Sequence, residues 1–146
     1  TYAYRVAGTE TTGVCESDDT ACVQVTATGA CTLLPTFAGI SSASTPNTAD
    51  CTHNLTWPAA TAQCGGPMTF NVYRSTASGF TPSPANRIAT GLSGTSYSDV
   101  DALISGTPYF YTVRAVDTSN GLEDTNNVKL SATRSADAPR ARLFLT

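Results

Sequence analysis

The one histidine, His53, is where a search for chemistry in this sequence begins. A nucleophilic mechanism would require a nucleophile beside it and an acid that orients the imidazole, and a zinc site would require further ligands. No such partner set accompanies His53 at a recognisable spacing. The alternation of His53, Leu55 and Trp57 instead puts it on the inner or edge face of a strand. We therefore interpret His53 as a structural residue and predict no catalytic residues, no cofactor and no enzyme activity.

Acidic side chains at two expected hairpin tips are the second candidate for chemistry. The stretch from Asp117 to Glu123 carries oxygen donors at alternate positions, which gives it a faint likeness to a calcium loop. A calcium loop needs several well-placed carboxylates or carbonyls, and this spacing lacks them. Solvated turns rich in Asp, Asn and Gly are the expected structure, so we predict no metal site. The two groups are Glu16, Asp18 and Asp19, and Asp117, Glu123 and Asp124.

Five cysteines and a single methionine indicate an oxidising compartment, because cytosolic chains seldom carry cysteine at this density. Reduced cytosolic thiols are the alternative. Cys15 and Cys22 flank a polar stretch with the character of a hairpin tip, and we predict a disulfide between them. We expect a secreted or cell-surface protein on these grounds.

The remaining cysteines are Cys31, Cys51 and Cys64, and sequence alone does not settle how they pair. Cys31 precedes the first strand expected for the complete domain and Cys64 follows the second, so both lie at one pole. Cys51 begins the second strand, about 20 Å from its far end, whereas a disulfide needs Cα atoms within about 7 Å. We therefore favour Cys31–Cys64. One cysteine is then left over, and we expect its partner in a missing part of the preceding module.

Composition excludes two classes of partner. The net charge is −3 and there is no basic stripe, so the electrostatic signature of nucleic-acid binding is missing. No run of about 18 apolar residues is present, so we expect no membrane insertion. Charged residues make up 13 % of the chain, and low charge with abundant Thr and Ser suits half-exposed β-strands.

The sequence repeats itself after about one hundred residues. The first repeated phrase is Tyr2-Ala3-Tyr4-Arg5-Val6, which returns 107 residues later as Tyr109-Phe110-Tyr111-Thr112-Val113. A second echo relates residues 19–28 to residues 124–133 at a spacing of 105. A period near 100 with short alternating strands is typical of tandem β-sandwich modules. The first copy holds only the last two strands, so residues 1–30 are predicted to end a truncated module.

Seven strands with turn signals between them are expected in the second copy. Their inward-facing residues would form a core that includes Trp57, Phe70, Val72, Tyr111 and Val113. No amphipathic helix of useful length is expected. The predicted strands cover residues 37–43, 51–57, 68–75, 87–90, 95–100, 109–116 and 126–134.

These strands resemble a fibronectin type III domain. Trp57 lies in the second strand, Asn71-Val72-Tyr73-Arg74-Ser75 matches the third strand of bacterial members, and residues 103–116 match the sixth-strand signature. The resemblance covers residues 36–134 and implies an all-β, seven-strand immunoglobulin-like sandwich. An immunoglobulin domain is disfavoured because no cysteine sits where its B–F bridge needs one. We expect a complete domain at residues 31–135, and a linker with the first strand of a following domain at residues 136–146.

The resemblance also implies roles. Tyr109 would form a tyrosine corner, with its hydroxyl bonded to backbone near Leu103, and Gly106 would supply a positive φ. By family, the chain would be a non-catalytic spacer, adhesion or protein-interaction module of a larger secreted or surface bacterial protein. One alternative is an accessory segment of a secreted hydrolase. Another is a structural subunit of an extracellular assembly that strand exchange completes.

Aromatic side chains outside the expected core are the candidate partner contacts. Tyr73, Phe80, Tyr97 and Phe110 are predicted at exposed positions, where aromatics bind sugars or proteins. The alternative is that one or two of them pack under the long loop around Phe80. The expected partners are neighbouring domains of the same polypeptide, together with another protein chain or a glycan.

Overall fold

The computed structural model describes residues 2–8, 23–26, 28–46 and 51–134. The chain divides into two compact units, Thr1–Ala30 and Cys31–Thr146. Cys15, Cys22 and the tail predicted to start a following domain lie outside the described residues.

The described residues of unit 1, 2–8, 23–26 and 28–30, include one antiparallel pair of strands. β1 (Tyr2–Tyr4) pairs with β2 (Val23–Val25), and Tyr2 lies opposite Val25. The side chains of Tyr2, Tyr4 and Val6 are exposed in this unit. Tyr2 and Tyr4 alternate along β1, so they share one face of the strand, and Val6 continues the alternation just beyond its end.

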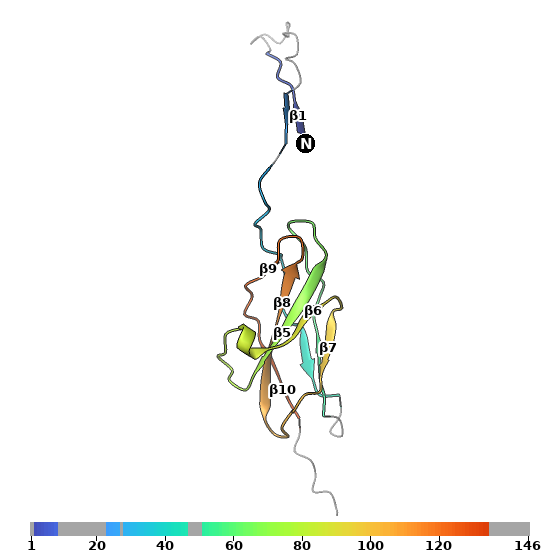
Figure 1. Cartoon of the computed structure of the whole chain (residues 1–146). Helices are drawn as coiled ribbons and strands as arrows, with labels where there is room; N and C mark the ends of the chain where they lie inside the picture. Colours follow the sequence, from blue (N-terminus) through green and yellow to red (C-terminus); the bar gives the residue numbers. More distant parts are fainter. Residues whose placement is uncertain (1, 9–22, 27, 47–50, 135–146) are drawn as a thin grey trace, which may run out of the picture. The chain divides into compact units, whose positions relative to one another are not determined.

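Unit 2 is a sandwich of two antiparallel sheets (Figure 1). The smaller sheet has the order β3-β4-β7, and the larger has the order β10-β8-β5-β6 with β9 also paired to β8. The 3₁₀ helix η1 (Pro84–Asn86) precedes β6. The strands are β3 (Ser42–Ser44), β4 (His53–Thr56), β5 (Met68–Ser75), β6 (Arg87–Leu92), β7 (Ser96–Asp99), β8 (Pro108–Asp117), β9 (Leu122–Glu123) and β10 (Leu130–Thr133).

The core lies between the two sheets and follows the alternation of the strands. β4 buries His53 and Leu55, and Trp57 is buried just beyond its end. The ring centroids of Trp57 and Phe70 are 5.5 Å apart. β8 lines the interior with every second residue, because successive side chains of a strand point to opposite faces. Its buried residues on this face are Tyr109, Tyr111, Val113 and Ala115.

The first strand of unit 2 is much shorter than predicted. Only Ser42–Ser44 pairs with β4, whereas residues 37–43 were expected as strand. Gly39 interrupts the segment with a φ of 87°, and a Cβ there would collide with Val128. Glycine is needed at such a close approach. Before this turn, Thr36 forms an isolated bridge with Thr61.

The last strand is also shorter, because side chains replace part of its backbone ladder. Residues 126–134 were expected as one strand, but β10 begins at Leu130 and the two-residue β9 lies before it. Between them, Asp124 accepts a hydrogen bond from the amide of Ala115, and the Asn126 side chain donates to the carbonyl of Val113 over 2.9 Å. These contacts hold the segment against β8 without regular pairing.

The corner before β8 has the predicted form. The Tyr109 hydroxyl accepts from the amide of Ile104 over 3.1 Å and donates to the carbonyl of Ala102 over 3.3 Å. Gly106 has a φ of 76°, which only glycine adopts without strain. Its amide donates to the carbonyl of Arg134 over 2.9 Å, which ties the corner to the residue that follows β10.

Candidate functional site

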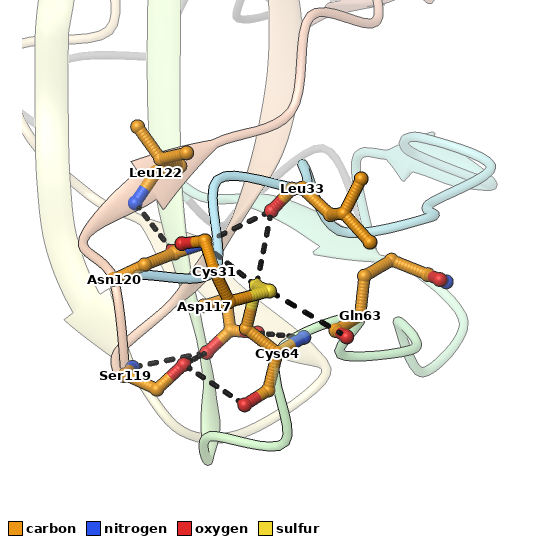
Figure 2. Close-up of a disulfide and its surroundings, with 8 residues drawn as sticks. All are labelled: Cys31, Leu33, Gln63, Cys64, Asp117, Ser119, Asn120 and Leu122. Carbon is orange, nitrogen blue, oxygen red and sulfur yellow. Dashed lines mark hydrogen bonds between the residues drawn. A yellow bond between two sulfur atoms is a disulfide. The ribbon is translucent and has the colours of Figure 1, made fainter. Parts of the chain in front are cut away.

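A disulfide joins Cys31, the first residue of unit 2, to Cys64 in the loop before β5 (Figure 2). Their Cα atoms are 5.7 Å apart, within the range of disulfides. This is the pairing that the pole argument favoured. The bond fixes residues 31–36, which we call the lead segment, to one end of the sandwich.

Asn120 strengthens this attachment from the β8–β9 turn. Its side-chain amide donates to the carbonyls of Cys31 and Leu33 over 3.3 and 3.0 Å. Its oxygen accepts from the amide of Leu122 over 3.0 Å, which sets the direction of the side chain. Figure 2 shows Asn120 lying between this turn and the lead segment. We call the disulfide, Asn120 and Asp117 the clasp.

Asp117 organises the other half of the clasp. Its carboxylate accepts from the Ser119 hydroxyl and amide over 2.6 and 2.9 Å, and from the amide of Cys64 over 3.1 Å. Gly66 leaves room for this carboxylate, since a Cβ there would collide with it. The bonds from Ser119, with further ones from the amides of Cys64 and Gly66, lower the pKa of Asp117. The carboxylate therefore stays charged and keeps these donors near neutral pH.

Two further contacts hold the far end of the lead segment. Thr36 and Thr61 exchange backbone hydrogen bonds of 3.0 and 2.9 Å. The Gln63 side chain donates to the Thr36 hydroxyl over 3.1 Å. The lead segment is therefore attached at Cys31, Leu33 and Thr36, about every second or third residue.

Sequence reasoning found the disulfide but not the rest of the clasp. Asp117 and Asn120 were interpreted as solvated turn residues, with a weak alternative as calcium ligands. Their polar atoms instead serve backbone groups of the lead segment and of the loop before β5. Among residues 2–8, 23–26, 28–46 and 51–134, no group of His, Cys, Asp or Glu is arranged to hold a metal ion. The sequence feature that indicates the position of Asn120 is the Asn120-Gly121 turn, which lies at the same pole as both cysteines.

Cys51 lies apart from the clasp. It is an exposed free thiol, and the Arg134 guanidinium donates to its sulfur over 2.6 Å. That its disulfide partner belongs to a preceding module stays a prediction.

His53 belongs to a polar network inside the sandwich. The Tyr111 hydroxyl donates to Asp99 over 2.7 Å, so it must accept from Nδ1 of His53, which lies 2.8 Å away. Arg74 donates to both oxygens of Asp99 over 2.9 Å and thereby balances its charge. The four residues come from β4, β5, β7 and β8, so the network links the two sheets.

Burial sets the protonation of this network. Removal from water lowers the pKa of His53, and the nearby Asp99 opposes this only in part. Burial, with the hydrogen bond to Asp99, raises the pKa of Tyr111 far above its usual value. His53 is thus neutral and Tyr111 protonated at neutral pH. Side chains that hold their protons inside a core are suited to a structural role.

The predicted exposure of Tyr73 and Phe80 is wrong. Tyr73 is 3 % exposed and Phe80 is 8 % exposed, although both lie off the inner core. Tyr73 donates to Glu123 of β9, and Arg114 covers its ring at 6.0 Å. Lys129 lies 5.5 Å over the ring of Phe80. The chain after β8 folds over the outer face of the large sheet, so neither ring can serve as a contact surface.

The other two aromatic candidates, Tyr97 and Phe110, are half-buried.

Glu123 is the centre of polar contacts on the outer face of the large sheet, since it accepts from Tyr73 and Asn71 and lies 3.4 Å from Arg114. Burial and the bond to Glu123 raise the pKa of Tyr73. These groups satisfy one another, and they lock β5, β8 and β9 together.

The class of protein is defined by the all-β sandwich and by the tyrosine corner of Tyr109 at the start of β8. A solved structure, that of a Fn3-like protein from Clostridium thermocellum, is 37 % identical and covers 69 % of this chain and 91 % of its own, with a TM-score of 0.51. The chain belongs to this fibronectin type III-like family. A pectate lyase, PelI from Erwinia chrysanthemi, is 22 % identical over 68 % of this chain and 28 % of its own, with a TM-score of 0.43. No family profile and no curated protein matches the sequence.

Proposed function

We propose that this chain is a non-catalytic β-sandwich module that spaces and orients its neighbours in a larger extracellular protein. The clasp carries the proposal, because it ties the first residue of unit 2 covalently to the body of the sandwich. A spacer transmits orientation only if the chain that enters it is fixed to the rigid body. A free linker of the same length would sample many directions.

The attachment of the lead segment supports stiffness over its whole length. The disulfide holds Cys31, Asn120 holds the carbonyls of Cys31 and Leu33, and Thr61 holds Thr36. Each contact removes backbone freedom that an unattached segment would keep. The fixed stretch precedes β3, so the point at which a neighbour joins the module is itself fixed to the sandwich.

The proposed location is outside the cell or on its surface, in a bacterial protein. The Cys31–Cys64 disulfide fits an oxidising compartment. The described residues include no helix long and apolar enough to cross a membrane. Adhesion is a narrower version of this role. An accessory segment of a secreted hydrolase and a structural subunit completed by strand exchange are the alternatives, and the neighbours of the module decide between them.

Limited proteolysis of the full chain tests the proposal. The exposed side chain of Leu33 suits a protease that cuts after large apolar residues, whereas the bond after Leu34 is protected by Pro35. Cleavage requires the local backbone to open. We expect the oxidised chain to resist cleavage at this site, and the Cys31→Ser/Cys64→Ser variant to be cut there. Cys51→Ser is the matched control and should behave like the parent. Fragment masses are read after reduction. Rapid cleavage of the oxidised parent after Leu33 would overturn the proposal.

A further inference from the structure

The hairpin of unit 1 exposes residues that are buried at the matching places in unit 2. Tyr2, Tyr4 and Val6 are 63 %, 59 % and 69 % exposed, and we call them the tyrosine face. Their counterparts in the repeat are Tyr109, Tyr111 and Val113, which are 6 %, 0 % and 0 % exposed. An apolar strand face of this kind is a candidate interaction surface.

Strand register shows that the two hairpins have the same construction. One shift of 107 residues relates both of their strands, because 109 − 2, 111 − 4, 130 − 23 and 132 − 25 all equal 107. The sequence comparison placed the two copies of the second strand 105 residues apart, and the strand pairing corrects this spacing to 107. The matching pairs are Tyr2 with Val25 and Tyr4 with Val23 in unit 1, and Tyr109 with Ala132 and Tyr111 with Leu130 in unit 2.

A shared register carries information about the partner. Slipping one strand of a pair by a single residue moves its side chains to the opposite face. The tyrosine face therefore corresponds to the inner face of β8 and not to its solvent face. In unit 2, β8 has one neighbour along its edge and another across its inner face. β5 pairs along the edge of β8, with Val72 opposite Val113, and β4 packs across the core and brings His53 to Tyr111.

We propose that the tyrosine face docks the remaining strands of a second sandwich of the same kind, carried by the same polypeptide. Tyr4 would occupy the place that Tyr111 has in unit 2. The partner must then offer a strand edge beside β1, an apolar face over Tyr2 and Val6, and a polar pair that bonds the Tyr4 hydroxyl as His53 and Asp99 bond Tyr111. This partner does not depend on the spacing role of unit 2.

The experiment supplies such strands to the full chain. Residues 31–107, which contain β3 to β7, are placed directly before Thr1, so that the hairpin follows them as residues 108–134 do in unit 2. Hydrogen exchange is then measured at the amides of residues 2–6. The amides of β8 in unit 2 of the same molecule calibrate the protection that a completed sandwich gives. The natural chain, measured in parallel, gives the value without added strands.

We expect the extension to slow exchange at residues 2–6 by at least about a hundredfold, as for strands that open only with their whole sandwich. The extended chain should also stay monomeric. Tyr4→Ser should abolish the gain, and the matched change Ala3→Ser, on the opposite face, should keep it.

Two results would overturn the proposal. In the first, residues 2–6 exchange as fast in the extended chain as in the natural chain while β8 remains protected. In the second, the natural chain dimerises in a sedimentation experiment and Tyr4→Ser makes it monomeric, which would identify the partner as a second copy.

Discussion

The core holds the middle of β8 and the clasp holds its end, by different physical means. At the core, Tyr111 and Val113 are removed from water between two sheets. At the clasp, Asp117 and Asn120 use hydrogen bonds, next to a covalent bond, to hold a segment that is largely exposed. Burial of apolar surface stabilises the whole fold, whereas the clasp fixes the direction in which the chain enters it. A change in the core can therefore lower stability without releasing the lead segment.

The largest expected effect is at the core. Trp57→Ala should lower the free energy of unfolding by roughly 3–5 kcal/mol, because a large buried ring leaves a cavity. Ile104→Ala, at an exposed position, should change it by less than about 0.5 kcal/mol. Both are measured by denaturant titration under oxidising conditions. A loss below about 1 kcal/mol for Trp57→Ala would contradict the account of the core.

Removing the disulfide should come next. Cys31→Ser/Cys64→Ser is expected to cost about 2–4 kcal/mol, chiefly because the unfolded chain loses its cross-link. Cys51→Ser is the control and should leave the titration midpoint unchanged. If the double variant unfolds at the same midpoint as the parent, the clasp adds nothing to stability.

Mild acid should weaken the core and leave the clasp intact. The folded-state pKa of His53 lies below the value of 6.5 that it has when unfolded. The unfolded chain therefore binds the extra proton first as pH falls. Stability is full above about pH 6.5 and falls below it, by at most about 1.4 kcal/mol per pH unit for one proton.

The measurement is the denaturation midpoint at pH 7.5 and at pH 5. Tyr111, Asp99 and Arg74 face His53, and Asp117 titrates lower, since its pKa is depressed from 3.8. His53→Gln should flatten the profile over this range. A parent profile that is already flat would count against a neutral, buried His53.

The smallest expected effect is at the clasp side chain. Asn120→Asp replaces an amide donor by a carboxylate that faces the carbonyls of Cys31 and Leu33. We expect a loss of about 1 kcal/mol in the free energy of unfolding, together with new protease cleavage after Leu33. Asn127→Asp is the matched control, at an exposed position whose side-chain oxygen accepts from Arg114 and remains an acceptor in the variant. Equal effects of the two changes would show that Asn120 has no special role.

The sequence predicted elements whose pattern is local. β5 occupies residues 68–75 as expected, because its apolar alternation ends at turn residues on both sides. Residues 37–43 failed as a strand because the break at Gly39 depends on contact with Val128, far along the chain. Alternation placed Tyr73 off the core face, but it could not show that Glu123 and Arg114 cover that face.

The clasp was predictable only in its covalent part. Cys31 and Cys64 could be placed at one pole from strand order alone. Asn120 could not, because its role depends on how the β8–β9 turn lies against the lead segment in three dimensions.

The most direct test of the spacing role is backbone ¹⁵N relaxation of Thr32, Leu33, Leu34 and Thr36 in one sample, before and after reduction of the disulfide. We predict order parameters close to those of β5, about 0.85, in the oxidised protein, and values below about 0.6 after reduction. Low values in the oxidised protein would contradict the proposal that the clasp fixes the direction of the chain.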